Sequence, residues 1–74
     1  MTKANQLKII IVSDVDYEYL IAEIYCDGEY IALIHQENGL DNLQVEFPGR
    51  SISCNLEWLQ KALQEARIKL AGEK

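Results

Sequence analysis

Short runs of apolar and β-forming residues alternate with turn-like segments through the first two thirds of the chain. The segments between the runs are rich in Ser, Asp, Asn and Gly, and the last run stops at a Pro-Gly pair. This alternation predicts four strands, over 7–12, 17–26, 29–36 and 43–47. Because short connections make neighbouring strands antiparallel, we expect a four-stranded antiparallel meander.

The last third of the chain has the spacing of a helix. Apolar residues recur every three or four positions, which predicts one helix over 56–71 with an apolar stripe of Leu56, Leu59, Leu63, Ala66 and Leu70. Either Ser53 or Asn55 suits the N-cap, and Gly72 suits the position after the C-terminus. The predicted fold is therefore α+β, with the order ββββα, one domain over residues 1–74, and the helix packed on one face of the sheet.

The Asp27-Gly28 pair is the strongest hairpin signal in the chain, since a tight type I′ turn needs positive φ at both central residues. A two-residue turn there places Tyr25 opposite Tyr30 and Ile24 opposite Ile31. The predicted helix-covered face then carries Leu20, Ala22, Ile24, Ile31 and Leu33. The predicted open face carries Tyr17, Tyr19, Ile21, Glu23, Tyr25, Tyr30 and Ile34.

The second reversal, at Asn38-Gly39, allows two registers. A two-residue turn would place Leu43, Val45 and Phe47 on the open face, whereas a three-residue loop with a glycine bulge would place them under the helix. We favour the three-residue loop because it completes the core.

Charge is distributed very unevenly along the chain. Residues 9–49 contain no Lys or Arg, and the chain's net charge of −5 arises from a net −9 in this segment, partly offset by basic residues on either side. Such a surface repels phosphate backbones and anionic membranes and attracts basic proteins. The nine acids are Asp14, Asp16, Glu18, Glu23, Asp27, Glu29, Glu37, Asp41 and Glu46.

An aromatic surface beside these carboxylates predicts a protein-binding site. Acidic faces often serve solubility alone, and tyrosine suits the solvated side of a strand. All four tyrosines on one face, together with two isoleucines, instead favour an interface. We therefore expect the partner-binding residues to be Tyr17, Tyr19, Ile21, Glu23, Tyr25, Asp27, Glu29 and Tyr30.

The sequence carries no catalytic, metal-binding or cofactor-binding signature, so we expect no enzyme activity and no cofactor. The single histidine, His35, is predicted to lie opposite Leu20 at the sheet edge as a structural residue. Cys26 and Cys54 are interpreted as buried thiols, because a cytoplasmic chain is expected and their spacing does not suit a metal. The cytoplasmic expectation rests on the N-terminal apolar run, which is too short for a signal peptide or a membrane span.

Three segments carry a resemblance to a known class of protein. The run Asp27-Gly-Glu-Tyr-Ile-Ala-Leu-Ile34, the segment Val45-Glu-Phe-Pro-Gly49, and Leu56-Glu-Trp-Leu59 with Ala62 and Ala66 resemble small bacterial immunity proteins that neutralise nuclease toxins of contact-dependent or type VI competition systems. The resemblance covers residues 17–71 in layout. It implies a cytoplasmic, non-catalytic inhibitor that blocks the active cleft of a toxin.

The hypothesis that follows is an acidic immunity or antitoxin protein bound to a basic nuclease toxin, without direct nucleic acid or membrane contact. Two alternatives remain open at this stage. One is a phage-encoded DNA mimic that inhibits a restriction or CRISPR nuclease. The other is a homo-oligomer, in the simplest case a homodimer, in which the tyrosine faces pack together.

Overall fold

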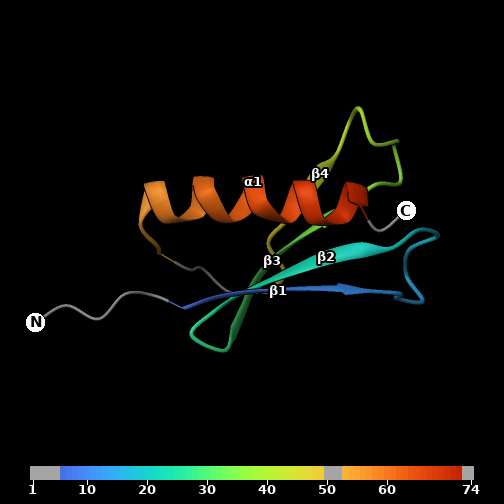
Figure 1. The fold of residues 1–74 in the computed structure, drawn as a ribbon. Helices are drawn as coiled ribbons and strands as arrows, with labels where there is room; N and C mark the ends of the chain where they lie inside the picture. The colour runs from blue at the N-terminus through green and yellow to red at the C-terminus, as the bar shows by residue number, and fades with distance from the viewer. Residues whose placement is uncertain (1–5, 50–52, 73–74) are drawn as a thin grey trace, which may run out of the picture.

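The computed structural model describes residues 6–49 and 53–72 and contains one antiparallel sheet and one helix. The strand order β1-β2-β3-β4 follows the chain, so the sheet is the predicted meander. Helix α1 lies across one face of this sheet (Figure 1). The elements are β1 (Leu7–Val12), β2 (Ile21–Cys26), β3 (Glu29–His35), β4 (Gln44–Glu46) and α1 (Leu56–Gly72).

The core lies between α1 and the sheet. It is built from buried residues of β2, β3 and α1, and the side chains of alternate β1 residues pack against it: Leu7, Ile9 and Ile11. On the helix, Ala62, Ala66 and Leu70 are buried, and the small alanines allow close approach to the strands. The predicted apolar stripe is therefore correct at its centre, but it omitted Ala62 and included Leu56, which is largely exposed.

A β-bulge in β3 changes the predicted register of the hairpin. Tyr25 pairs with Tyr30 as expected, but the next pair is Ile24 with Ala32, so Ile31 is an extra residue without a partner in β2. Both Ile31 and Ala32 belong to the core cluster under the helix. Beyond the bulge every side chain of β3 is on the opposite face from the one predicted.

Two predicted positions are exchanged as a result. Leu33 pairs with Glu23 and lies on the open face, whereas Ile34 belongs to the core under α1. His35 is not opposite Leu20 but pairs with Gln44 of β4. It is nearly buried at 9% exposure, which agrees with a structural residue.

The second reversal is longer than either predicted turn. Because His35 pairs with Gln44, residues 36–43 form the connection, with Gly39 at a φ of 95°. Val45 pairs with Ile34, and Leu43 packs against the core, so both lie on the helix side as the favoured register required. Phe47 follows the end of β4 and is exposed.

Local hydrogen bonds explain where the elements begin and turn. Asp27 adopts a φ of 53° and Gly28 a φ of 88°, as a type I′ turn requires. Asp27 is also bound to Gln6, whose backbone N–H donates to Oδ1 at 2.7 Å and whose carbonyl accepts from the Asp27 N–H at 2.8 Å. At the helix start, Asn55 Oδ1 accepts from the Trp58 N–H at 2.9 Å, so Asn55 is the N-cap. Gly72 is still helical and does not have a positive φ.

Candidate protein-binding surface

The open face of the sheet carries a tyrosine pair next to a carboxylate. Tyr25 and Tyr30 lie directly opposite each other on β2 and β3, with ring centroids 5.3 Å apart and planes inclined by 27°. The Tyr25 hydroxyl donates a hydrogen bond to Glu23 Oε1 at 2.9 Å. Two stacked rings and an oriented carboxylate therefore form one partly exposed patch.

A second tyrosine and carboxylate pair lies beside the first. The Tyr17 hydroxyl donates to Glu46 Oε1 at 2.6 Å, and the Tyr17 ring lies 5.3 Å from the ring of His35. The other carboxylate oxygen of Glu46 is 3.5 Å from His35 Nε2. The Glu37 backbone N–H donates to His35 Nδ1 at 3.3 Å, which assigns the ring proton to Nε2, next to Glu46.

The pKa of the Tyr30 hydroxyl is affected by the carboxylates of both pairs. Burial raises its pKa to about 12, and the negative charges of Glu23, Asp14 and Glu46 act in the same direction. The pKa of Tyr17 is also raised to about 12, first because its hydroxyl donates to Glu46. The hydrogen bond to Glu23 likewise raises the pKa of Tyr25. These phenols stay protonated, and their surroundings are rich in negative charge.

We call the set formed by Tyr17, Glu23, Tyr25, Tyr30 and Glu46 the phenol–carboxylate cluster. Its members come from β2, β3, β4 and the β1–β2 connection, so the antiparallel sheet brings residues distant in sequence into one surface. Each of the two carboxylates accepts a hydroxyl hydrogen bond on one oxygen. Carboxylates held in this way are oriented acceptors for a cationic group that approaches from outside.

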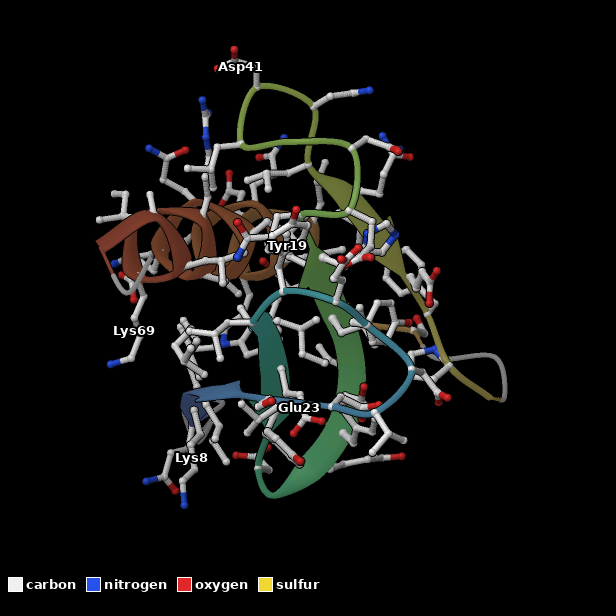
Figure 2. All side chains as sticks on the ribbon, turned by 90° about the vertical axis from the view of Figure 1, so that its right-hand side faces the viewer. Lys8, Tyr19, Glu23, Asp41 and Lys69 are labelled. Atoms are coloured by element: carbon white, nitrogen blue, oxygen red, sulfur yellow. The ribbon has the colours of Figure 1, made fainter. Side chains whose placement is uncertain are left out.

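Tyr19 lies outside the phenol–carboxylate cluster. The backbone N–H groups of Glu18 and Tyr19 both donate to Glu37 Oε2, at 3.0 and 3.1 Å, which holds the end of the β1–β2 connection against the β3–β4 connection. Tyr19 is 53% exposed. Figure 2 shows it well apart from Glu23, towards the loop that carries Asp41.

Three other predicted contact residues do not belong to this surface. Ile21 has no exposed area and therefore cannot contact a partner. Glu29 pairs with Cys26, whose side chain packs against the core, and therefore belongs to the helix-facing set of positions. Asp27 is exposed, but its carboxylate is engaged by the Gln6 backbone in the turn.

Sequence reasoning missed two residues that help to form this surface. Glu46 joins it because Glu46 pairs with Leu33, which the bulge turns to the open face. Lys8 pairs with Tyr25, so one basic residue next to the acidic segment also lies on the open side (Figure 2). The favoured register places Val45 under the helix, so the alternation along β4 already signalled that Glu46 lies on the open face.

Some features of the described residues bear on the other expectations. Cys26 and Cys54 are free, partly buried thiols, and burial is the main cause that raises the pKa of Cys26. Within residues 6–49 and 53–72, no three His, Cys, Asp or Glu side chains are grouped so that they could hold a metal ion. In the same part of the chain, no helix has the length and apolar character needed to cross a membrane.

Comparison with known proteins gives no relative for this arrangement. No protein-family model, no curated protein and no solved structure matches the chain.

Proposed function

We propose that this chain is a small acidic, non-catalytic inhibitor that binds a basic nucleic-acid-binding protein, as a cytoplasmic immunity or antitoxin protein binds a nuclease toxin. The observation that carries the proposal is the Tyr25–Tyr30 stack beside the oriented Glu23 carboxylate. Aromatic area supplies binding energy at low entropic cost, and the carboxylate selects a cationic partner.

The charge of the surrounding surface supports a basic partner. Glu46 and Asp14 act on the same phenol as Glu23, so at least three carboxylates contribute negative potential at the Tyr30 ring. Lys8 is the basic residue that the register places next to Tyr25. A nuclease cleft lined by Lys and Arg to bind phosphates has the complementary potential, which speeds capture.

The phenol–carboxylate cluster has the chemistry to bind an arginine of such a cleft. A guanidinium group can stack on the exposed part of the Tyr25–Tyr30 pair while it donates to the free oxygen of Glu23. Glu46, with one oxygen bound by Tyr17 and the other near His35, offers a second acceptor. A partner held this way would have its phosphate-binding groups occupied, which explains inhibition without catalysis.

The decisive experiment is co-purification from the native host, followed by a nuclease assay on the purified partner. The prediction is a partner that cleaves nucleic acid and is inhibited by the wild-type chain. Combined Tyr25→Ala and Glu23→Lys substitutions should abolish inhibition, and association with the wild-type chain should slow as salt concentration rises. Leu56→Ala is the matched control, because Leu56 is 67% exposed on the helix and lies outside the cluster.

Each alternative outcome has a definite meaning. Unchanged inhibition by the Tyr25→Ala, Glu23→Lys variant would refute the site assignment. A restriction or CRISPR nuclease as the partner would favour the DNA mimic over an immunity protein. A chain that purifies alone, and that self-associates through the Tyr25–Tyr30 surface, would replace the proposal with the homo-oligomer.

A further inference from the structure

We propose that β1 is a self-pairing edge strand, through which two copies of this chain form a two-fold symmetric dimer with a continuous eight-stranded sheet. The strand order places β1 at one edge of the sheet, and it is six residues long with a single charged residue, Lys8. Long apolar edge strands readily pair with another strand unless something blocks them. The proposal is independent of the open face and of its partner.

Hydrogen bonds at the start of β1 indicate which backbone groups point outward. Gln6 accepts from the Asp27 N–H, so its backbone faces β2. Backbone direction alternates along an antiparallel strand, and the register continues from Gln6 through Leu7↔Cys26 and Lys8↔Tyr25. The backbones of Lys8, Ile10 and Val12 therefore face β2, whereas those of Leu7, Ile9 and Ile11 point away from β2, where residues 6–49 and 53–72 place no further strand.

These three outward residues suit pairing of β1 with a second β1. If the two-fold axis passes at Ile9, then Ile9 pairs with its own copy, and Leu7 pairs with Ile11 of the other copy. The side chains of all three residues pack against the core under α1, so both helices then lie on the same face of the extended sheet. If the pairing of the two β1 strands shifted by one residue, Leu7, Ile9 and Ile11 of one copy would lie opposite residues of the other copy whose backbone groups face β2. The hydrogen bonds between the two copies would then be lost.

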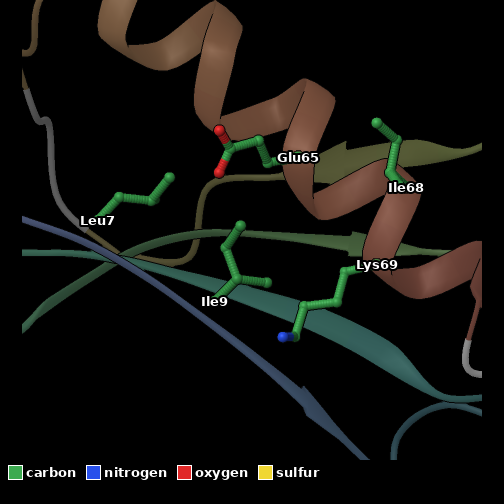
Figure 3. A pocket seen from close by; sticks show the side chains of 5 residues that line it. All are labelled: Leu7, Ile9, Glu65, Ile68 and Lys69. Carbon is green, nitrogen blue, oxygen red and sulfur yellow. The ribbon is translucent and has the colours of Figure 1, made fainter.

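The groove beside β1 supports a second copy as the occupant. It has a volume of about 470 Å³ and is lined by Leu7 and Ile9 from the strand and by Glu65, Ile68 and Lys69 from the helix. Figure 3 shows Leu7 and Ile9 rising towards the helix, with Lys69 reaching down to the strand. Glu65 and Lys69 make the lining neutral in a chain of net charge −5.

Two-fold symmetry makes this lining complementary to itself. A two-fold axis at Ile9 makes the two α1 helices antiparallel. Glu65 of one copy then lies near Lys69 of the other, and Lys69 of the first copy lies near Glu65 of the second. Ile68, which is exposed in the monomer, then lies close to the axis. An acidic or basic foreign peptide would satisfy only one of the two charges.

The opposite edge of the sheet does not offer the same surface. Strand β4 has three residues, carries Glu46, and is followed by Pro48, all of which discourage pairing. Self-pairing of β1 therefore gives a closed dimer rather than a growing sheet.

Amide hydrogen exchange tests the strand pairing residue by residue. In the monomer the amides of Leu7, Ile9 and Ile11 should exchange fast, and their protection should increase with protein concentration. The amides of Lys8, Ile10 and Val12 are the internal control and should be protected at all concentrations, since they bond to β2. A sedimentation series that shows a strict monomer up to millimolar concentration would refute the proposal, as would a dimer in which the Ile9 amide remains unprotected.

Charge exchange tests the two-fold arrangement without altering the strand. Glu65→Lys should raise the dimer dissociation constant by roughly tenfold, because two attractive contacts become repulsive. Adding Lys69→Glu to the same chain should restore the wild-type constant. Gln60→Lys is the matched control, since Gln60 lies on the other side of the helix beside Leu43 and Val45. Equal effects of Glu65→Lys and Gln60→Lys would contradict the arrangement.

Discussion

The Tyr17→Phe substitution removes one hydroxyl group that ties the β1–β2 connection to the far edge of the sheet. The Tyr17 hydroxyl donates to Glu46 Oε1 at 2.6 Å, and the Tyr17 ring lies against His35. Phenylalanine keeps the ring and its contact. The variant therefore measures the hydrogen bond rather than the packing.

The expected cost follows from the charge and the exposure of the acceptor. Hydrogen bonds to charged groups contribute about 1.5–3 kcal/mol in protected sites. The Glu46 side chain is 51% exposed, so water replaces much of the lost interaction, and we expect about 1 kcal/mol. For a domain of this size, that change lowers the Tm by roughly 4–8 °C.

The same bond predicts how the effect depends on pH. In the folded state the pKa of Tyr17 is raised from 10.0 to about 12. Because the folded state holds the phenol proton more tightly than the unfolded state, this contribution is complete below pH 10 and is lost between pH 10 and pH 12. The stability gap between wild type and Tyr17→Phe should therefore close over this range. Tyr30, whose pKa is also about 12, is present in both proteins and cancels.

Urea unfolding followed by Trp58 fluorescence measures these stabilities, because Trp58 is the only tryptophan and packs against the core. A double-mutant cycle with Glu46→Gln should give a coupling energy of about 0.5–1 kcal/mol. Additive effects of the two substitutions, or a gap that stays constant from pH 8 to pH 12, would refute the reasoning.

Three further substitutions test the core, the helix cap and the hairpin turn by thermal unfolding. Ile24→Ala opens a cavity at a completely buried position in β2 and should cost about 2–5 kcal/mol, a large fraction of the stability of so small a domain; a Tm within about 5 °C of wild type would contradict this core. Asn55→Ala removes the acceptor for the Trp58 N–H and should cost about 1 kcal/mol, whereas Ser53→Ala should cost little. Gly28→Ala places a β-carbon at a φ of 88° and should cost about 1–2 kcal/mol through backbone strain alone, since no atom lies within 4 Å of the added group.

The elements that sequence reasoning located correctly have local causes. Asp27-Gly28 sets its turn through the φ values of two residues, and β1 and α1 follow from apolar runs of the right period. The meander and the side on which Val45 lies then follow from short connections and from the demand for a filled core. Apart from the side of Val45, which was inferred from the need to fill the core under the helix, these features needed no information about contacts between distant segments.

The errors have non-local causes. The bulge at Ile31 is stabilised by burial of both Ile31 and Ala32 under α1, a gain that depends on a helix about 30 positions further along the chain. The end of the β1–β2 connection is held by Glu37, which accepts hydrogen bonds from the amides of Glu18 and Tyr19 although it lies 18 or 19 positions further along the chain. The 17–26 run therefore begins as an ordered loop and becomes a strand at Ile21, although its composition is typical of a strand throughout.

The candidate surface was predicted in part. Tyr25, Tyr30 and Glu23 lie together because they are next to the turn, where the register was correct. Glu46 lies on the open face in the favoured register too, but its hydrogen bond with Tyr17 joins residues 29 positions apart and has no local signal. Ile21 could not be excluded, since its complete burial is not evident from its position in the strand.

The bulge at Ile31 shifts the alternation of side chains along β3 by one residue. Tyr30 and Leu33 are three positions apart and yet lie on the same face of the sheet. In an uninterrupted strand, only residues an even number of positions apart share a face. Deleting Ile31 would leave Tyr30 and Leu33 two positions apart, so a strand of plain alternation would still hold both on the same face. Losing the bulge without a deletion would instead exchange Leu33 with Ile34 and turn Glu46 away from Tyr17. The bulge therefore determines which residues of β3 form the open face as much as the identities of those residues do.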